Sequence, residues 1–288
     1  MSNWFARNIR TAFKEPQVIS AYLRWIASRI LGGHGPNIWC TAHYRMAVWT
    51  GFNDYYGSYR LFLEGASDFL LMSRTARSAD PNHTVAIDVG ANLGLFTLNM
   101  IEAGFNQVHA FEADPETFAR LCVNIRGNRL QERTRLNCLA AGENFGLARF
   151  AIAGAAALHY VDPIGRDTDS QSICVATVSL DAYCQEFHID RIDFLKIDVE
   201  GYEPWVIRGM EQLLTRRRVK TILLEICPDN LKRAGSSVHE LYTALAKWGY
   251  LPHEVDASGA IGRELSAAAL EDVASINAAC ISADDTAS

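Results

Sequence analysis

The sequence lacks the patterns that define several large protein classes. Its seven cysteines are scattered and include no CxxC pair, so the usual zinc-ligand spacings and a disulfide framework are not expected. No apolar run approaches the roughly 18 residues that cross a bilayer, and the start shows neither a continuous apolar segment nor the A-x-A signal of a secretory peptide. We therefore expect a cytoplasmic protein whose thiols are reduced and mostly buried.

Basic charge is also scarce over most of the chain. The 288 residues include 27 basic and 33 acidic ones, for a net charge of −6, which argues against nucleic acid as the main partner. Hydrophobic residues make up 49% and charged residues 21%, as in ordinary globular proteins. There is no internal repeat and no long linker, so the length suits one large domain with a smaller element.

Residues 1–31 differ from the rest, because they hold five basic side chains against one acidic one. Their apolar residues recur at helical spacing between Pro16 and the Gly32–Gly33 pair, which predicts an amphipathic helix. We expect this helix to pack on the main domain; the alternative is a weak contact with a membrane surface. The apolar face is formed by Ile19, Tyr22, Leu23, Ile26 and Ile30.

From residue 84 onward, strand-like and helix-like segments alternate. Buried, β-branched strands that alternate with helices predict an α/β fold with a doubly wound, Rossmann-like, mostly parallel sheet. Strands are expected at residues 84–89, 107–112, 134–139, 192–198, 221–226, 250–255 and 276–282, with a β-hairpin at 147–152 and 173–178. Helices are expected at residues 94–103, 115–126, 179–187, 203–214 and 237–247.

The stretch VAIDVGANLGLFTLN joins a strand, a glycine turn and a helix start within fifteen residues. In such a sheet, this turn lies at the carboxyl edge where ligands bind, and glycine lets a ligand approach the backbone. A dinucleotide fits poorly, because the G-x-x-x-G spacing lacks the middle glycine and Asp88 would repel a pyrophosphate. A ligand with a cationic end fits better.

S-adenosylmethionine (SAM) is such a ligand, with an ammonium, a sulfonium and a ribose diol. Asp88 could accept a hydrogen bond from the ammonium, directly or through water. Glu112 follows the next strand, 18 residues after Gly94, close to the spacing expected of a carboxylate that binds ribose hydroxyls. Glu112 could instead cap the following helix, although Asp114 is better placed to do so.

Five segments in order resemble the FkbM-like family of SAM-dependent methyltransferases: IDVGANLGLFT, AFEADPETF, VSLDAYC, DFLKIDVEGYEPWVIRGMEQLL and ILLEI. The resemblance covers roughly residues 84–228, and KIDVEG with the preceding SLD is its most specific part. It implies a class I methyltransferase fold, with a seven-stranded sheet whose last strand is antiparallel, and methyl transfer to a hydroxyl. It also implies that the cofactor is bound by Asp88, Gly90, Asn92, Gly94 and Glu112, and we include Ala91 of the same turn.

A second group of charged residues follows the strand at 192–198. Asp198 and Glu200 lie at its carboxyl end, and methyl transfer to a hydroxyl needs a base there; Asp198 is the first candidate and Glu200 the second. Lys196 and Glu225 are expected to form a structural ion pair. We predict no metal, although Asp198 with the Asp229–Asn230 pair could hold Mg²⁺. Two histidines, His159 and His253, could also reach the crevice.

These patterns favour an O-methyltransferase that acts on a hydroxyl of a small molecule or glycan. The alternatives are a SAM-binding partner protein without turnover and, less favoured, a nicotinamide-dependent oxidoreductase. Residues 81–288 would form the SAM-binding domain, and residues 1–80 a helical and aromatic extension that could close as a lid. In that case one of Tyr55, Tyr56 and Tyr59 should contact the cofactor pocket. The sequence predicts no oligomeric state.

Overall fold

The computed structural model describes residues 36–40, 45–49, 66–152, 159–163 and 171–282. The amphipathic helix expected near the start of the chain and the three tyrosines of the proposed lid lie outside these ranges.

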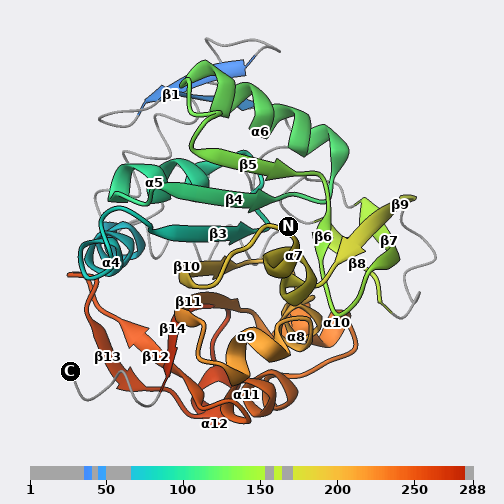
Figure 1. Cartoon of the computed structure of the whole chain (residues 1–288). Coiled ribbons are helices and arrows are strands. Elements are labelled where there is room, and N and C mark those ends of the chain that lie inside the picture. Colours follow the sequence, from blue (N-terminus) through green and yellow to red (C-terminus); the bar gives the residue numbers. More distant parts are fainter. Residues whose placement is uncertain (1–35, 41–44, 50–65, 153–158, 164–170, 283–288) are drawn as a thin grey trace, which may run out of the picture.

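The main sheet has eight strands in the order β13-β12-β14-β11-β10-β3-β4-β5 (Figure 1). The pairs from β5 to β11 are parallel, and β14 runs antiparallel to both β11 and β12. The predicted α/β, mostly parallel sheet with an antiparallel last strand is therefore confirmed. The strands are β3 (Val85–Val89), β4 (Gln107–Phe111), β5 (Thr134–Asn137), β10 (Ile192–Ile197), β11 (Val219–Ile226), β12 (Tyr250–Val255), β13 (Ile261–Glu264) and β14 (Ile276–Ser282).

The eighth strand, β13, was not expected from the sequence. It pairs antiparallel with β12, and Asp256 organises the turn between them by accepting hydrogen bonds from the backbone N–H groups of Ser258 and Ala260. Because β13 is a short edge strand with mostly exposed residues, it shows little of the apolar alternation that identifies a strand in a sequence.

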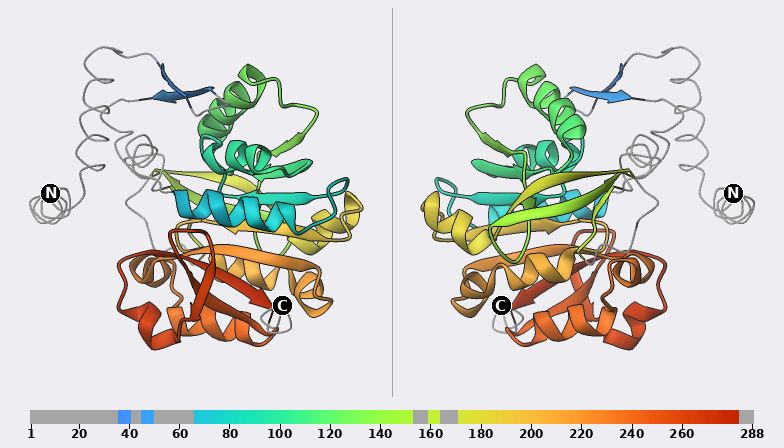
Figure 2. Two further views of the ribbon diagram at one scale, coloured as in Figure 1. Left: turned by 90° about the vertical axis from the view of Figure 1, so that its left-hand side faces the viewer. Right: turned by 90° about the vertical axis from the view of Figure 1, so that its right-hand side faces the viewer.

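Helices cover both faces of the sheet, as alternate side chains of the central strands require. On β10, Phe194 packs with residues of α4 (Ala66–Arg77), α5 (Leu95–Ala103) and α6 (Pro115–Gly127). Its neighbour Leu195 packs in a second core with residues of α7 (Leu180–Glu186), α8 (Glu203–Arg208), α9 (Glu211–Thr215) and α11 (Val238–Ala246). Elements before β6 fill one half of the molecule and those after β10 the other (Figures 1 and 2).

The single helix expected at residues 203–214 is two helices, α8 and α9. They separate at Gly209, where a β-carbon would lie 1.9 Å from the carbonyl oxygen of Gly142. The backbones of Gly209 and Gly142 are therefore in close contact at the break between the two helices, which the amphipathic pattern alone did not reveal. Two further short helices, α10 (Pro228–Arg233) and α12 (Ala267–Glu271), were not expected. None of the described helices is long and apolar enough to span a membrane.

A smaller sheet of order β6-β9-β7-β8 lies beside the carboxyl ends of the main strands (Figure 1). Its strands are β6 (Ala140–Ala141), β7 (Gly146–Ile152), β8 (Tyr160–Val161) and β9 (Gln171–Val178). The antiparallel pairing of β7 with β9 confirms the predicted hairpin. A separate pair, β1 (Pro36–Cys40) and β2 (Arg45–Trp49), is antiparallel and lies beside α6.

Candidate functional site

The glycine turn at residues 90–94 connects the carboxyl end of β3 to α5. Its backbone has positive φ at Gly90 (+82°), Asn92 (+50°) and Gly94 (+96°). The N–H groups of Gly90 and Ala91 both donate to the carbonyl of Phe111, at 3.0 and 2.9 Å. The turn is therefore held against the end of β4, with its backbone in conformations that favour glycine.

The same turn packs against the residue that follows β10. A β-carbon on Gly90 would lie 1.8 Å from the carbonyl oxygen of Asp198, and the N–H of Asp198 donates to the carbonyl of Val89 at 3.0 Å. The strand order reverses between β3 and β10, since the chain goes outward from β3 through β5 and returns on the other side. Both groups of residues singled out in the sequence thus meet at the crevice where open α/β sheets bind ligands.

Asp88 lies on β3 beneath this turn and is 1% exposed. Its Oδ2 accepts a hydrogen bond from Thr97 Oγ1 at 2.6 Å, whereas its buried Oδ1 has no hydrogen-bond partner within the part of the chain that the structure describes. Burial raises the pKa of Asp88 to about 6, against the lowering effects of Thr97 and Lys196. A buried acceptor without a donor is costly, so a ligand that supplies a donor here would be stabilised.

Glu112 follows β4 and fastens the turn from the other side. Its Oε2 accepts from the N–H of Asn92 and its Oε1 from the N–H of Asp114, both at 2.8 Å. The side chain is 8% exposed, and burial raises its pKa to about 7. The cap of α6 is Asp114, which accepts from the N–H groups of Glu116 and Thr117. Each oxygen of Glu112 keeps a second lone pair that a ligand hydroxyl could use.

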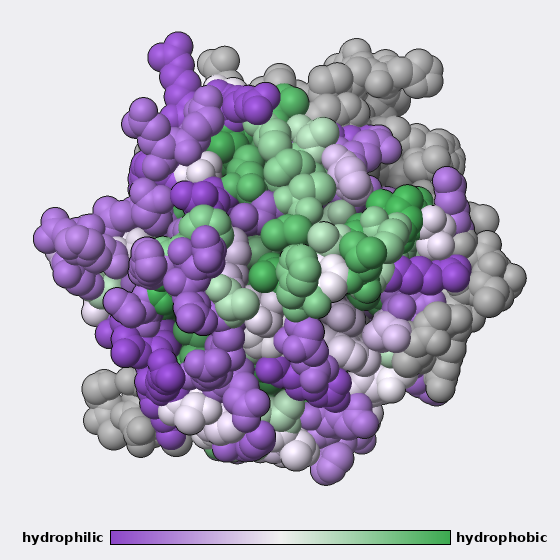
Figure 3. Space-filling view, turned by 45° about the vertical axis from the view of Figure 1, so that its right-hand side comes forward, coloured by the Kyte–Doolittle hydropathy of each residue, from purple (hydrophilic) through white to green (hydrophobic). Residues whose placement is uncertain are grey.

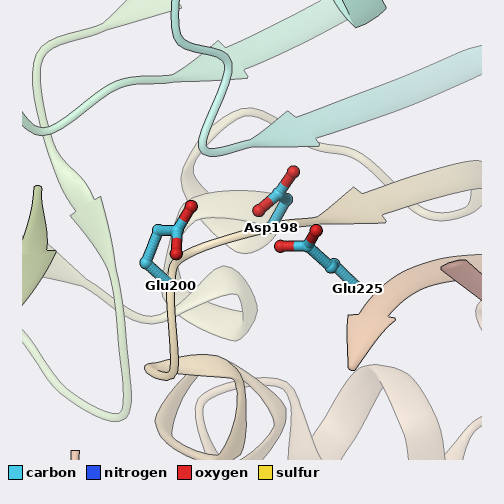
Figure 4. Close-up of side chains that lie close together, drawn as sticks. All are labelled: Asp198, Glu200 and Glu225. Carbon is cyan, nitrogen blue, oxygen red and sulfur yellow. The ribbon is translucent and has the colours of Figure 1, made fainter. Parts of the chain in front are cut away.

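Three carboxylates gather at the ends of β10 and β11 (Figure 4). One oxygen each from Asp198, Glu200 and Glu225 lies within 4.8 Å of the others. Asp198 and Glu200 belong to the loop after β10, and Glu200 adopts a left-handed conformation with φ +55°. Glu225 lies on β11 and accepts a hydrogen bond from Ser275 Oγ at 3.1 Å. The predicted convergence of these acids at one edge of the sheet is observed.

Lys196 supplies a buried positive charge beneath this cluster. It is 1% exposed, its Nζ donates to Asp198 Oδ2 at 2.9 Å, and it lies 4.7 Å above the centre of the Phe96 ring. Burial opposes the charged form, but the carboxylates of Asp198 and Glu225 outweigh it and raise the pKa of Lys196. The sequence predicts an ion pair between Lys196 and Glu225. In the structure Lys196 donates directly to Asp198, and Glu225 is near enough to raise the pKa of Lys196.

Glu203 is a contributor to the site that the sequence reading missed. It is 3% exposed, and its Oε1 accepts from the N–H groups of Val199 and Gly201, both at 3.1 Å. Burial raises its pKa to about 7. The carboxylate therefore holds the loop that carries Asp198 and Glu200. The sequence does contain a signal for this role, since Glu203 is an acidic residue only two positions after the glycine of KIDVEG.

Two residues of α10 hold Glu200 from the opposite side. Asn230 Nδ2 donates to Glu200 Oε2 at 2.6 Å, and Arg233 Nη2 donates to the Glu200 carbonyl at 2.9 Å. The Arg233 guanidinium also lies 4.1 Å above the ring of Tyr160 on β8. The sequence suggests Asn230 only as a metal ligand, because its pattern predicts no helix at residues 228–233.

Of the two histidines considered, His159 reaches the crevice and His253 does not. His159 Nδ1 lies 3.5 Å from Asp114 Oδ2, and its ring meets that of Phe150 edge to face at 6.0 Å. His159 and Tyr160 together connect the Glu112 side of the crevice to α10. His253 lies on β12 and lines a different cavity. When the carboxyl-end side of the molecule is turned forward, apolar residues gather over the middle of that face (Figure 3).

The three carboxylates could in principle hold a divalent cation, since Mg²⁺ prefers oxygen ligands. The ammonium of Lys196 already neutralises part of their charge. The set differs from the one suggested by the sequence, because Glu200 and Glu225 join Asp198. The Asn230 side chain reaches the cluster by donating to Glu200.

Comparison with known proteins identifies the family of the chain. Residues 88–252 match the model of the family described as the methyltransferase FkbM domain. A hexuronic acid methyltransferase from Haloferax volcanii is 30% identical over 142 residues, which are 48% of this chain and 54% of the relative. The chain thus spans about half the length of this curated relative.

Two solved structures resemble the chain at low identity. One is an FkbM methyltransferase from Methylobacillus flagellatus, 17% identical with a TM-score of 0.38 over 50% of this chain and 33% of that one. The other is a SAM-dependent methyltransferase from Agrobacterium tumefaciens, 9% identical with a TM-score of 0.44 over 85% of this chain and 68% of that one. The family match covers more than half of the sequence. The chain therefore belongs to the FkbM methyltransferase domain family, whose cofactor is S-adenosylmethionine.

Proposed function

We propose that this protein transfers a methyl group from SAM to a hydroxyl oxygen of a small molecule or glycan. The observation that carries the proposal is the position of three carboxylates, those of Asp198, Glu200 and Glu225, directly beside the glycine turn. Methyl transfer to a hydroxyl requires two things: a site that holds the cofactor, and a base that receives the proton. The glycine turn can supply the first and the carboxylates the second.

SAM matches the groups that surround the turn. Among the described residues, Oδ1 of Asp88 has no hydrogen-bond partner, and it is an acceptor suited to a cationic donor. Glu112, on the other side of the turn, would accept hydrogen bonds from the ribose hydroxyls. The open backbone between them admits a ligand at close range. The proposed cofactor-binding residues are Asp88, Gly90, Ala91, Asn92, Gly94 and Glu112.

When bound, SAM supplies an electrophilic methyl group on its sulfonium. The chain must then hold the acceptor hydroxyl in line with that methyl and remove its proton as the new carbon–oxygen bond forms. Asp198 is the proposed base, held in place by Lys196, and Glu200 is the second candidate. The proton passes to the carboxylate, and the electrons of the broken carbon–sulfur bond stay on sulfur.

The acidic cluster favours a hydroxyl over a carboxylate as the methyl acceptor. A carboxylate is already a nucleophile and needs no base, and three nearby acids would repel it. The hexuronic acid named for the Haloferax volcanii relative contains both kinds of oxygen. We propose that an acidic sugar would be methylated here at a hydroxyl, with its carboxylate turned away from the cluster.

The test is to incubate the full chain with SAM and a panel of glucuronic and galacturonic acid glycosides. Release of S-adenosylhomocysteine and a gain in mass of one methyl group are expected. Mild alkali then distinguishes the products, since a methyl ether survives it and a methyl ester is hydrolysed. An alkali-labile product would contradict the hydroxyl assignment. SAM binding without turnover on any hydroxylated acceptor would favour the partner-protein alternative.

A further inference from the structure

A row of polar side chains crosses the main sheet at its carboxyl edge. The strands β3, β10, β11 and β14 are neighbours there (Figure 1), and their register puts Asp88, Lys196 and Glu225 on one face. Because β14 runs antiparallel to β11, its first residues also lie at this edge. The row therefore extends beyond the acidic cluster by one strand, about 4.8 Å, to Asn277 of β14.

Asn277 is placed directly beside Glu225. The two residues are register partners in the pairing of β11 with β14, and such partners point to the same face of a sheet, with β-carbons about 4.5–5.5 Å apart. Ser275 lies two residues before Asn277 and donates from its Oγ to Glu225 Oε1 at 3.1 Å. Ser275 and Asn277 thus continue the wall of the crevice to which Glu225 belongs.

The orientation of the Asn277 amide is fixed by α4. Its Nδ2 donates to Oδ2 of Asp68, in the first turn of that helix, at 2.8 Å. An ionised carboxylate can only accept a hydrogen bond, so the amide nitrogen must face Asp68. The amide oxygen is therefore the end that remains for another partner.

This amide oxygen lacks a donor. Asn277 Oδ1 is buried and has no hydrogen-bond partner within the described part of the chain, like Asp88 Oδ1 at the other end of the row. A buried acceptor without a donor is costly, and a ligand hydroxyl that donates to Oδ1 would remove this cost. Asn277 as a whole is partly exposed, so it lies near the surface of the crevice.

The groups around Asn277 suit hydroxyls better than apolar surface. Besides Oδ1, the second hydrogen of Asn277 Nδ2 is a donor, and the Ser275 oxygen can accept while it donates to Glu225. A hydroxyl can donate to one of these groups and accept from another. An aromatic or aliphatic surface would leave them unpaired, and sites built to bind a hydroxyl reject such ligands strongly.

We propose that Ser275 and Asn277, with Asp68 behind them, bind further hydroxyls of the methyl acceptor, which is therefore a sugar and not a phenol or a simple alcohol. The inference rests on the proposed methyl transfer, which puts the reacting hydroxyl at Asp198. The three residues of this subsite lie outside residues 88–252, which match the family. The subsite is thus a feature of this chain and not of the matched family pattern.

The test measures binding, so it needs no turnover. The full chain is titrated by calorimetry with S-adenosylhomocysteine, and the loaded protein is then titrated with methyl glucuronoside, methyl galacturonoside and 4-hydroxybenzoate, which has a carboxylate but one hydroxyl. The better glycoside should bind at least about tenfold more tightly than 4-hydroxybenzoate. Failure to bind S-adenosylhomocysteine would overturn the proposed function. A loaded protein that binds neither glycoside, or prefers 4-hydroxybenzoate, would overturn the subsite alone.

Asn277→Leu nearly keeps the volume of the side chain and removes both polar ends of the amide. It should weaken binding of the better glycoside at least about fivefold, as expected for two neutral hydrogen bonds. Its affinity for S-adenosylhomocysteine should not change, which also shows that it is folded. Ser275→Ala, at an exposed position, should weaken glycoside binding by a smaller factor. The matched control is Asn82→Leu, at an exposed position before the amino end of β3, which should bind the glycoside normally.

A second comparison separates direct contact from an indirect effect. Glycosides that each lack one ring hydroxyl are titrated into the unmodified protein and into Asn277→Leu. The glycoside without the hydroxyl that contacts Asn277 should bind the unmodified protein more weakly but lose little more in the variant, because both changes remove the same hydrogen bond. Losses that add for every glycoside, or a variant with unchanged affinity, would overturn the proposal and leave Asn277 Oδ1 to a buried water.

Discussion

Gly90 and Asp198 are in closer contact than any other residue type at position 90 would allow. A β-carbon at Gly90 would lie 1.8 Å from the Asp198 carbonyl oxygen, and the backbone there has φ +82°. This contact joins the proposed cofactor turn to the loop that carries the proposed base. The two halves of the site therefore cannot shift independently.

Gly90→Ala should consequently disrupt cofactor binding. Forcing alanine into this conformation costs about 1–3 kcal/mol, and the clash must also push the turn away from β10. We expect the affinity for SAM, measured by calorimetry, to fall at least about tenfold. The matched control is Gly127→Ala at the end of α6, where a β-carbon would meet nothing within 4 Å. If both variants bound SAM normally, the turn would not be the cofactor site.

Glu112→Ala should weaken SAM binding by about 1.5–3 kcal/mol, the contribution of hydrogen bonds to a charged group. The structure adds a second cause, because the variant also loses the acceptors that hold the N–H groups of Asn92 and Asp114. The control is Glu116→Ala, which removes the same charge from an exposed side chain paired with Arg120. An unchanged affinity in the Glu112 variant would remove the ribose assignment.

The same residue predicts how SAM binding depends on pH. Burial raises the pKa of Glu112 to about 7 in the ligand-free protein, so its carboxyl is largely protonated below that pH. A ligand that donates hydrogen bonds favours the ionised form, and its affinity should therefore rise as the pH increases through about 7. In Glu112→Gln this step should be absent from calorimetric titrations across the range. If the SAM affinity of the variant rose by the same factor over this pH range, the pH dependence would belong to another group.

Glu203 predicts a pH dependence of stability. Its pKa is raised from 4.5 to about 7 by burial in the folded protein, so between these values the folded state binds more protons than the unfolded state. The stability from the protonated side chain is complete below about pH 4.5 and is lost as the pH rises to about 7. The loss is at most about 3 kcal/mol, at 1.36 kcal/mol for each pKa unit.

Glu203→Gln keeps an oxygen that can accept from Val199 and Gly201 but cannot ionise. Relative to the unmodified protein, the variant should therefore gain stability between about pH 5 and pH 8, measured by urea unfolding. Glu271→Gln, at an exposed position, is the control and should show no such change. A difference between variant and parent that is constant with pH would contradict the role of Glu203 titration.

The sequence was sufficient to locate the central strands, because they are short, mostly apolar segments that alternate with helices. β10 is buried at every position, and the residues that follow it, Asp198 and Glu200, stand out as the first acids after an apolar run. Alternation along β10 likewise placed Lys196 and Asp198 on one face. A strand, and the charged residues at its end, can therefore be predicted from the spacing of apolar residues in the local sequence.

The features that were missed depend on contacts between distant segments. The break at Gly209 packs against the backbone of Gly142, and Glu200 is held by Asn230, thirty residues away. The turn at Gly259 likewise packs on the backbone of α4, almost two hundred residues earlier in the chain. None of these contacts leaves a periodic signal, so no reading of local pattern could have supplied them.

Asp198→Asn should lower turnover at least about a hundredfold, the low end for a positioned acid–base group. The asparagine oxygen can still accept from Lys196, which limits the cost of leaving that buried ammonium unpaired. SAM affinity should therefore change little, and this measurement separates lost chemistry from lost structure. Near-normal turnover, with whichever hydroxylated acceptor is used, would shift the base to Glu200, for which Glu200→Gln is the matching variant.

Removal of divalent cations should leave turnover largely intact. The carboxylates of Asp198, Glu200 and Glu225 lie close enough to share a cation, but Lys196 already places a positive charge among them, with its Nζ 2.9 Å from Asp198. A bound Mg²⁺ next to this ammonium would be repelled by it. Dialysis against EDTA should thus change neither the initial rate nor the thermal unfolding midpoint.

A metal site at this cluster would give different results. If EDTA abolished turnover, Mg²⁺ restored it, and Mg²⁺ alone raised the unfolding midpoint of the chelated protein, the cluster would be a metal site. Glu225→Gln would then remove the midpoint shift, because it deletes a ligand without touching the Asp198 side chain. If no metal is bound, Glu225→Gln instead removes one of the carboxylates that hold Lys196 charged. In that case, adding Mg²⁺ should change the thermal unfolding midpoint of the Glu225→Gln variant as little as it changes that of the unmodified protein.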